Sequence, residues 1–318
     1  MFISKKKVVA LAASVAVLAI TATSFTPAQA APKNQARAVV QADWLEKNLD
    51  DPKVVVVEVS TEPGIYERGH IRNSVKIAWH TDLVDTVNRD VVSAANFQKF
   101  AQAAGINQDT TVVLYGDKNN WFAAWGAWIF NIYGQKDVRV LDGGRVKWEK
   151  DGRPLTTVVP TLPAGNFVAT KADKALRATL INDVLPVAKK RVKADLIDIR
   201  GADEYNGKIF AAPGFQELAV RAGHIPGAIN VPWGANVNAD GTFKTVAELK
   251  KLYADKGVDG KQNIITYCRI GERSSLTWFV LSEILGYNVK NYDGSWTEYG
   301  NSVGVPIVNN AGTIWGAA

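Results

Sequence analysis

The chain has 318 residues and only one cysteine, Cys268. A single cysteine excludes any disulfide within the chain, so no covalent cross-link supports the fold. Exported proteins usually carry cysteines in pairs, and a lone thiol in an oxidising compartment is prone to mispairing. We therefore expect Cys268 either to be buried or to have a chemical function.

The chain also lacks a stripe of lysine and arginine residues interleaved with aromatic side chains, the pattern typical of nucleic-acid binding. Its formal net charge of +6 falls to +3 without the first 30 residues, which hold three lysines and no acidic residue. We expect no nucleic-acid partner. A small anionic substrate would suit this mild positive charge, although proteins without such a substrate carry similar charges.

The N-terminus has the three parts of an export signal. Lys5–Lys7 are basic, Val8–Ala22 is an uncharged apolar run, and Ala28–Ala30 has the small-x-small pattern of a cleavage site. The run is shorter than a membrane span, and no cysteine follows it to carry a lipid anchor. We predict a signal peptide over residues 1–30, cleavage after Ala30, a periplasmic or secreted protein, and no membrane association after cleavage.

An internal repeat with an offset of about 150 residues organises the rest of the chain. Gly69–Trp79 (GHIRNSVKIAW) resembles Gly223–Trp233 (GHIPGAINVPW). The flanking landmarks recur in the same order, namely apolar runs at 54–59 and 194–199, apolar runs at 111–115 and 263–267, and Asp-Gly at 142–143 and 293–294. Four landmarks at matched spacing predict two similar domains.

Each copy alternates short apolar strands with helical stretches, which predicts an α/β fold with a parallel sheet and helices on both faces. Thr245 and Glu248 form a capping box that opens a helix. Pro154–Pro163 is rich in turn-forming residues and is taken as the linker. We place the N-terminal domain at residues 31–158 and the C-terminal domain at residues 165–318.

The chemistry is expected where the strand 263–267 ends at Cys268 and a helix begins near Ser274. Ligands bind at this carboxyl edge of parallel sheets. The helix N-terminus, Arg269 and Arg273 all favour a thiolate, which predicts a lowered pKa for Cys268. Gly271 lets the loop curl with its N–H groups turned inward, as an anion-binding nest.

The loop CRIGERSS at residues 268–275 and the upstream GHIPGA at 223–228 resemble the rhodanese homology domain. The resemblance extends from about Val39 to the C-terminus and implies two rhodanese-like domains. The tandem form of this family has an inactive first domain and an active second domain. Aligning Tyr115 with Tyr267 places Gly116 opposite Cys268, so the N-terminal domain is expected to lack the nucleophile.

The resemblance implies a thiosulfate sulfurtransferase. Thiolate Cys268 would attack the outer sulfur of thiosulfate, release sulfite and carry a persulfide, which cyanide or a thiol then removes. The loop residues Arg269, Ile270, Gly271, Glu272, Arg273 and Ser274 would bind the substrate and the persulfide. No metal or organic cofactor is required by this chemistry. We expect a monomer.

Two features favour thiosulfate as the donor. Family members that use 3-mercaptopyruvate usually carry a loop without these two arginines, and several eukaryotic members have an arginine where this chain has Glu204. The alternatives are a 3-mercaptopyruvate sulfurtransferase and a non-enzymatic protein that binds sulfur or a thiophilic metal. A cysteine phosphatase is disfavoured, since such enzymes separate Cys and Arg by five residues whereas four separate Cys268 from Arg273.

Several residues have structural alternatives. His70 and His224 occupy the same place in both copies, and a shared structural role explains them better than catalysis. Asp198 and Arg200 are either supporting partners of the loop or an ordinary ion pair. Arg273 either holds substrate or pairs with Glu272 and positions the loop. The helical aromatic stretch from residue 121 to 128 is expected in the core, with Trp121 at its edge a candidate for lining a cleft.

Overall fold

The computed structural model describes residues 35–216 and 218–316 of the chain. The predicted signal peptide, residues 1–30, lies outside this part. Among the described residues, no helix combines the length and apolar character needed to cross a membrane.

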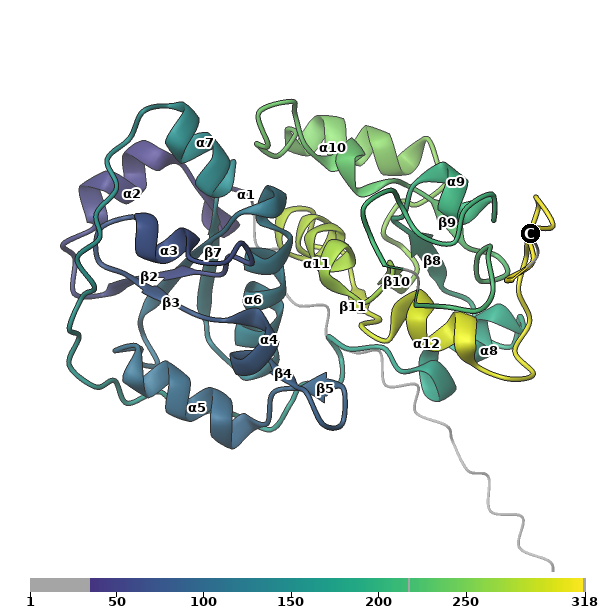
Figure 1. The fold of residues 1–318 in the computed structure, drawn as a ribbon, viewed down its shortest axis with the longest axis horizontal. Coiled ribbons are helices and arrows are strands. Elements are labelled where there is room, and N and C mark those ends of the chain that lie inside the picture. The colour runs from purple at the N-terminus through teal and green to yellow at the C-terminus, as the bar shows by residue number, and fades with distance from the viewer. Residues whose placement is uncertain (1–34, 217, 317–318) are drawn as a thin grey trace, which may run out of the picture. The chain divides into compact units, whose positions relative to one another are not determined.

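A five-stranded parallel sheet in the order β1-β7-β6-β2-β3 forms the centre of the N-terminal domain (Figure 1). Valines in these strands explain the sheet, because branched side chains on both faces favour strands that are covered on both sides. The strands are β1 (Val39–Val40), β2 (Val54–Glu58), β3 (Ser74–Lys76), β6 (Thr111–Tyr115) and β7 (Asp137–Leu141), and a separate antiparallel pair is formed by β4 (Val84–Asp85) and β5 (Asp90–Val91).

Helices cover both faces of this sheet. Successive residues of β6 alternate between the two cores, with Val113 packing beside Leu45 and Trp148, and Val112 packing beside Phe97. One face therefore lies under α2 and α7, and the other lies under α5 and α6. The helices are α1 (Gln35–Ala38), α2 (Ala42–Asn48), α3 (Ile65–Arg68), α4 (Trp79–Asp82), α5 (Ala94–Ala103), α6 (Trp121–Ile132) and α7 (Gly144–Lys150), with a 3₁₀ turn at Lys118–Asn120.

The C-terminal domain repeats this plan with a four-stranded parallel sheet in the order β11-β10-β8-β9. Its strands are β8 (Asp195–Asp198), β9 (Ile229–Asn230), β10 (Ile264–Tyr267) and β11 (Val289–Asn291). Its helices are α8 (Leu185–Ala188), α9 (Ala202–Tyr205), α10 (Val246–Ala254), α11 (Glu272–Phe279) and α12 (Ser295–Asn301), with π-helical turns at Leu180–Val184 and Val280–Ile284 and a 3₁₀ turn at Trp233–Asn236. The predicted fold class is confirmed.

The connection between the sheets, residues 154–179, contains no regular helix or strand. Thr156 forms a β-bridge with His70, and the N–H of Phe167 donates to the Ile106 carbonyl. The buried Phe167 ring also contacts Phe97 edge to face. The segment therefore follows the surface of the N-terminal domain past the predicted linker, and the exact domain limits stay a prediction.

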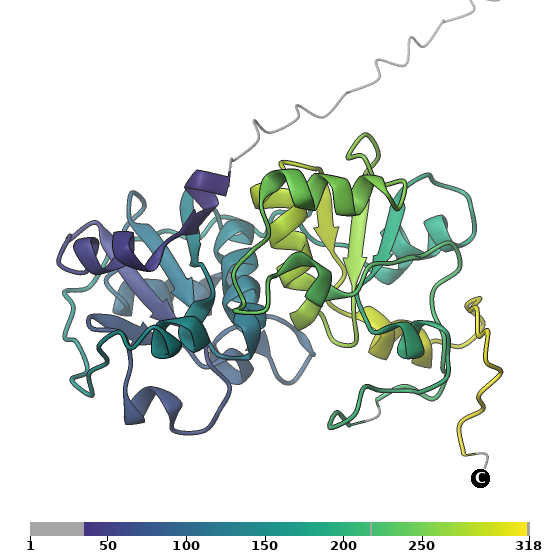
Figure 2. The same ribbon diagram turned by 90° about the horizontal axis from the view of Figure 1, so that it is seen from above.

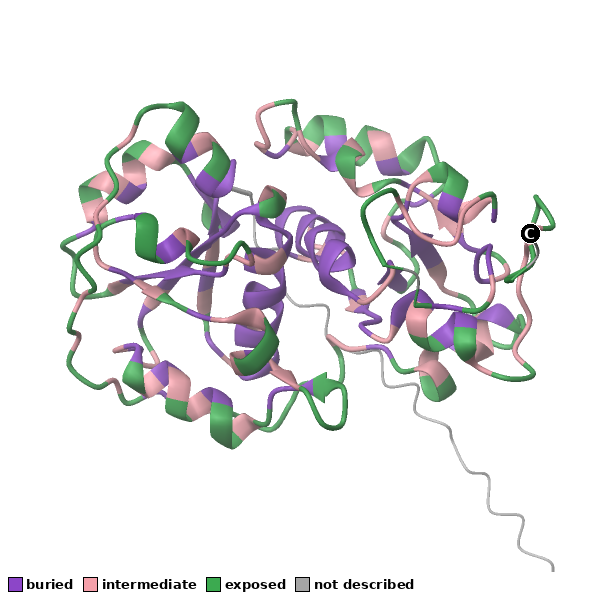
Figure 3. Ribbon diagram, viewed as in Figure 1, coloured by how far each residue is buried: buried purple, intermediate pink, exposed green. Residues whose placement is uncertain are grey.

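Helices α6 and α11 pack against each other and join the two domains (Figures 1 and 2). Every residue of α11 is buried, and α6 is buried over most of its length (Figure 3). Trp125 and Trp128 of α6 belong to the same apolar core as Cys268 and Leu276. One continuous core thus spans both domains, and the thiol lies within it.

The local sequence signals have clear structural counterparts. Thr245 caps α10, its hydroxyl accepts the N–H of Glu248, and the Glu248 carboxylate accepts the N–H of Thr245, so the predicted capping box is confirmed. Helix α11 begins at Glu272, two residues earlier than expected, because Gly271 takes a left-handed conformation with φ of 101° directly before it.

Candidate active site

Cys268 is the first residue after β10, at the carboxyl edge of the C-terminal sheet. Its backbone N–H donates to Ser295 Oγ at 3.1 Å, and its carbonyl accepts the N–H of Trp296 at 3.0 Å. Both partners belong to the start of α12, which therefore fixes the end of the strand. The cysteine side chain is fully buried.

The loop curls around the sulfur as the sequence predicts. The N–H of Gly271 donates to Cys268 Sγ at 3.1 Å. A β-carbon at position 271 would lie 2.6 Å from Trp125 Cζ3 and 2.7 Å from Asp293 Cα. Glycine is therefore required twice, for the positive φ and for the close approach of an aromatic ring from the N-terminal domain.

The carbonyl of Gly271 is held by a cluster of side chains, of which the sequence indicated only Ser274, as a substrate-binding residue. Ser274 Oγ donates to it at 3.0 Å, Ser275 Oγ at 2.8 Å and Asn291 Nδ2 at 3.4 Å. In a trans peptide the N–H points opposite to the C=O, so this cluster also fixes the direction of the Glu272 N–H. Asn291 lies on β11, far away in sequence, and nothing in the loop motif indicates it.

The predicted lowering of the Cys268 pKa is wrong for this arrangement. Burial raises the pKa of the thiol above its ordinary value, and the Glu272 carboxylate raises it further. Arg273 and the backbone groups of Ser274 and Gly271 act in the opposite direction and are outweighed. The cations and the helix N-terminus are visible in the sequence, whereas the burial of the thiol and the position of the Glu272 carboxylate, with Oε2 3.5 Å from Sγ, depend on the fold.

Arg273 is committed to a second buried carboxylate. Its Nη1 and Nη2 donate to the two carboxylate oxygens of Glu204, at 3.2 and 3.3 Å, and both side chains are less than 5% exposed. The distance from Arg273 Nε to Glu272 Oε1 is 3.9 Å, so the alternative pairing with Glu272 is the weaker contact. Glu204, at the third position of α9, thus neutralises a cation that sequence reasoning assigned to the substrate.

Arg269 is differently placed, at the partly exposed edge of the loop. Its Nη1 donates to the carbonyl of Gln216 at 2.9 Å, and its guanidinium lies 5.2 Å from the centre of the Phe215 ring. The Phe215 ring also faces the Arg273 guanidinium at 5.6 Å. The Nε–H groups of both arginines are buried and have no hydrogen-bond partner in the described part of the chain.

The N-terminal domain contributes a cation to the same loop. Arg89 Nη2 donates to the carbonyls of Ile270 at 3.0 Å and Asp293 at 3.1 Å. Asp293, in the repeated Asp-Gly landmark, is also held by Arg177, with Nε–Oδ1 and Nη2–Oδ2 distances of 2.9 Å. Neither Arg89 nor Arg177 stands in a recognisable motif, because their role depends on contacts across the molecule.

Asp198 and Arg200 form a buried ion pair with an Nη2–Oδ2 distance of 2.6 Å. Arg200 also donates to the Gly223 carbonyl, and its guanidinium lies 4.7 Å from the centre of the Trp296 ring. No hydrogen bond described for either side chain reaches residues 268–274. The pair therefore supports the strand end indirectly, through Trp296, and combines the two alternatives left open by the sequence.

The two repeated histidines occupy identical structural positions. His70 stacks on Tyr66 with ring centres 3.8 Å apart and its Nδ1 lies 2.9 Å from the Tyr66 carbonyl oxygen. His224 stacks on Tyr205 at 3.7 Å and its Nδ1 lies 2.7 Å from the Tyr205 carbonyl oxygen. The predicted structural role is confirmed for both.

The equivalent loop of the N-terminal domain is closed by its own groups. Gly116 donates its N–H to Asn120 Oδ1 at 3.0 Å, and the carboxylate of Asp117 accepts the N–H groups of Thr61 and Glu62. A β-carbon at Gly116 would lie 2.2 Å from the carbonyl oxygen of Val59. A cysteine side chain therefore does not fit at the position that matches Cys268.

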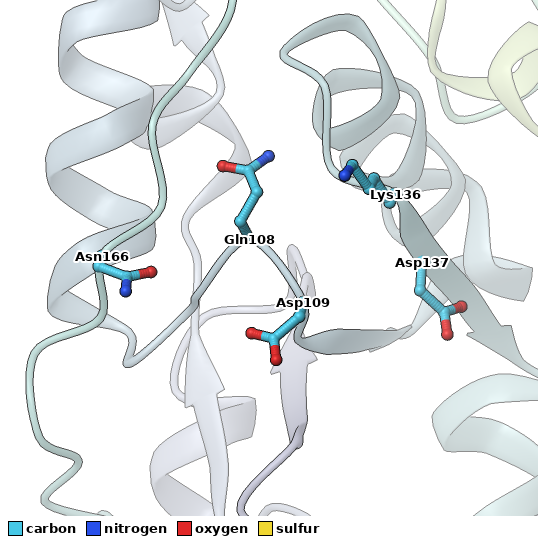
Figure 4. Close-up of a pocket in the computed structure, with 5 residues that line it drawn as sticks. All are labelled: Gln108, Asp109, Lys136, Asp137 and Asn166. Atoms are coloured by element: carbon cyan, nitrogen blue, oxygen red, sulfur yellow. The ribbon is translucent and has the colours of Figure 1, made fainter.

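Two cavities are described, and Cys268 lines neither of them. One of about 260 Å³, lined by Gln108, Asp109, Lys136, Asp137 and Asn166, opens at the amino ends of β6 and β7, opposite to the edge that holds Gly116 (Figure 4). Another, of about 210 Å³, lies beside Trp79 and Arg89. Within the described residues, no group of three or more His, Cys, Asp or Glu side chains is arranged to hold a metal ion.

A buried cysteine at the carboxyl edge of a parallel sheet, with its sulfur on a loop N–H before a helix, defines a class of α/β proteins built for covalent chemistry on sulfur. A family model described as "Rhodanese-like domain" matches residues 41–151 and 185–302, which together make up more than half of the chain. The chain belongs to the rhodanese family of sulfurtransferases.

Similar proteins share nearly the full length of the chain. A "Putative thiosulfate sulfurtransferase" from Mycobacterium tuberculosis is 54% identical over 271 residues, which cover 85% of this chain and 96% of the relative. "Sulfur carrier protein TtuD" from Thermus thermophilus is 51% identical over 273 residues, covering 85% and 95%. The crystal structure of SseA from Escherichia coli, a 3-mercaptopyruvate sulfotransferase, is 29% identical with a TM-score of 0.68 and covers 81% of this chain and 98% of that chain.

Proposed function

We propose that the protein transfers the outer sulfur of thiosulfate to cyanide or a thiol through a persulfide on Cys268. The observation that carries this proposal is the contact of 3.1 Å between the Gly271 N–H and Cys268 Sγ, at the start of a helix. An inward N–H at a helix N-terminus stabilises negative charge on sulfur, whether on a thiolate or on the outer atom of a persulfide.

In the proposed reaction, the Cys268 thiolate attacks the outer sulfur of thiosulfate. A new S–S bond forms, the bond between the two sulfurs of thiosulfate breaks, and sulfite leaves with the electron pair. An acceptor nucleophile then attacks the outer sulfur of the persulfide and regenerates the Cys268 thiolate. The step needs neither a metal nor an organic cofactor.

Arg269 is the better candidate for binding the sulfonate end of thiosulfate. Both forked nitrogens of Arg273 are occupied by Glu204, whereas Arg269 has one carbonyl partner and lies at the partly exposed edge of the loop. The unpartnered Nε–H groups of Arg269 and Arg273 supply two further buried donors in the loop. We expect Arg269→Met to raise the KM for thiosulfate more than it lowers kcat.

The test is sulfur transfer from thiosulfate to cyanide by residues 31–318, with Cys268→Ser and Arg269→Met measured beside it. Turnover by the wild type and none by Cys268→Ser supports the proposal. Arg191→Met, a change of an exposed arginine outside the loop, is a matched control that should behave as wild type. A folded, reduced wild-type protein without turnover would refute thiosulfate as the donor.

A second candidate, a sulfur carrier, is supported by the complete burial of Cys268 and by the similarity to the Thermus protein. A buried persulfide is protected from solvent and suits storage and delivery. A carrier would release one equivalent of sulfite per chain in a single burst and show no steady turnover with cyanide. A thiosulfate sulfurtransferase would continue to turn over.

The donor 3-mercaptopyruvate is a third candidate, supported by the similarity to SseA. Its carboxylate would approach a site that already contains Glu204 and Glu272, both less than 5% exposed. Glu204, at the place where several eukaryotic family members have an arginine, is paired with Arg273 and offers no cation to a substrate carboxylate, so thiosulfate is preferred. Comparing kcat/KM for the two donors distinguishes them.

The remaining predictions concern the rest of the chain. Export with cleavage after Ala30 would leave Ala31 as the first residue of the protein in a periplasmic or secreted fraction, which mass spectrometry detects. The N-terminal domain is proposed to act without a nucleophile, as support for the loop. A monomer is expected, and light scattering of residues 31–318 measures it.

A further inference from the structure

Glu272 is in contact with the nucleophile. Its Oε2 lies 3.5 Å from Cys268 Sγ, in the geometry of an S–H donor and a carboxylate acceptor. Both side chains are buried, with Glu272 only 2% exposed. A carboxylate so close to a thiol and shielded from water has no counterpart in the N-terminal domain, where Asn120 stands at the matching position.

Arg273 faces both groups, with its Nε 3.9 Å from Glu272 Oε1 and its charge acting on the Cys268 sulfur, but it is shared with another carboxylate. Arg273, on the same helix, is paired with Glu204 of α9. Asp293, on the loop after β11, is paired with Arg177.

The remaining charged groups lie at the edge of the site. Arg89, from the hairpin of the N-terminal domain, contacts the same Asp293 at 3.7 Å. Arg269 points to Phe215 and to the Gln216 carbonyl. The side facing α6 is closed by the Trp125 ring, which carries no charge. The cations near the sulfur are therefore balanced by other carboxylates or displaced from it.

Two negative charges 3.5 Å apart in a buried site repel strongly, so a thiolate and a carboxylate do not coexist there. When the sulfur becomes negative, the neighbouring carboxylate is the nearest group that can hold the proton.

We propose that Glu272 is a catalytic residue that takes the proton of the Cys268 thiol, keeps it while the persulfide is present, and returns it when the sulfur has been delivered. This inference rests on the proposed persulfide chemistry and adds the group that moves the proton. It also explains how a buried thiol, for which the thiolate form is unfavourable, can act as a nucleophile at neutral pH.

The two half-reactions balance. In the first, the Cys268 thiol, the Glu272 carboxylate and thiosulfate give the persulfide anion, protonated Glu272 and sulfite. One S–S bond forms, one breaks, and the thiol proton moves to the carboxylate. In the second, the persulfide anion, protonated Glu272 and cyanide give the thiol, the Glu272 carboxylate and thiocyanate. The buried pair carries one negative charge and one proton throughout.

Infrared difference spectroscopy tests the proton directly. Loading the wild-type protein with thiosulfate should remove the S–H stretching band and create the C=O band of a protonated carboxyl group, and cyanide should reverse both changes. The carboxyl band should be absent from Glu272→Gln and retained in Glu204→Gln, which changes the buried glutamate of α9 that pairs with Arg273. Loss of the S–H band without a new carboxyl band would overturn the proposal.

The pH profile of Glu272→Gln gives a second test. It distinguishes a carboxylate that accepts the proton from one that only repels the thiolate, because the two predict opposite changes in rate. Without the proton acceptor, the single-turnover release of sulfite at pH 7 should slow by about a hundredfold to ten-thousandfold. It should recover as rising pH generates the thiolate directly. If Glu272 acted only by repulsion, its removal would accelerate the reaction at pH 7, and an unchanged or faster rate would refute the proposal.

A change of sulfur donor distinguishes a failure of the proposed thiosulfate function from a failure of the role proposed for Glu272. Inorganic polysulfide also delivers a neutral sulfur to a thiolate, so it loads Cys268 even if thiosulfate is not the donor. A carboxyl band on loading with polysulfide but not with thiosulfate would refute thiosulfate and retain the role of Glu272. Persulfide formation by both donors, verified by intact mass, with no carboxyl band would refute the role of Glu272 alone.

Discussion

The substitution Glu204→Gln separates two effects of one buried ion pair. The Glu204 carboxylate accepts both forked nitrogens of Arg273 at 3.2 and 3.3 Å, and the side chains are 2% and 4% exposed. Breaking such a pair leaves an unbalanced buried charge, which costs about 3–5 kcal/mol. The glutamine oxygen still accepts one hydrogen bond, so we expect a loss of about 3 kcal/mol in the free energy of unfolding.

The same helix provides a matched control. Asp203 pairs with Lys208 at 3.0 Å, and these side chains are 58% and 63% exposed. An exposed pair contributes less than about 1 kcal/mol, so Asp203→Asn should change stability little. Urea denaturation of the wild type and the two variants at pH 7 measures both values. Equal and small losses for the two variants would refute the view that Glu204 balances a buried cation.

The second effect concerns the ligand. In Glu204→Gln, Arg273 has no carboxylate partner at its forked nitrogens and is free to bind an anion. In a Cys268→Ser background, where thiosulfate binds without reacting, Glu204→Gln should therefore bind thiosulfate more tightly. A tenfold change corresponds to about 1.4 kcal/mol, and calorimetry measures it. Weaker or unchanged binding of thiosulfate would mean that Arg273 does not contact the donor, even when Arg273 is no longer paired with Glu204.

Three further substitutions test the loops and the fold. Gly271→Ala should destabilise the protein by about 3 kcal/mol and abolish sulfur transfer, because an alanine there combines a positive φ with overpacking. The control Gly257→Ala, with φ of 81° and open space around its β-carbon, should cost only about 1 kcal/mol. Equal losses of stability in urea denaturation would contradict the predicted clash. Gly116→Cys should destabilise the N-terminal domain without adding a second reactive thiol, because its β-carbon would meet a backbone carbonyl at 2.2 Å, and two persulfides per chain by mass spectrometry would refute this. Burial lowers the pKa of His224 below its ordinary value of 6.5. The unfolded state therefore binds the proton more tightly, and the free energy of unfolding should fall as pH drops below about 6.5. His224→Asn should reduce this pH dependence of stability between pH 7 and 5, and an unchanged pH dependence would assign the effect to other groups.

The sequence predicts the architecture of this protein well because its signals are local and repeated. The strand before Cys268, the glycine that reverses the loop and the capping box at Thr245 each depend on neighbouring residues, and the repeat doubles the evidence for the sheets. A simple alignment of the two copies also identifies Gly116 as the residue that matches Cys268.

The electrostatics of the loop could not be predicted in the same way. A pKa depends on burial and on partners that are distant in sequence, and Glu204 is 69 residues from Arg273. Glu272 stands inside the loop motif, yet its distance from the sulfur depends on how Gly271 turns the chain. Arg89 belongs to the other domain, so no pattern around Cys268 indicates it.

The closed space at Gly116 has a consequence for the history of this chain. Two of the four glycine codons become cysteine codons by a single nucleotide change, so mutation alone can offer position 116 a thiol. The carbonyl of Val59, 2.2 Å from the β-carbon that such a change would add, makes each of these substitutions damaging. The backbone itself therefore keeps a nucleophile out of the first copy, and two working copies would require a rearrangement of the chain that follows β2.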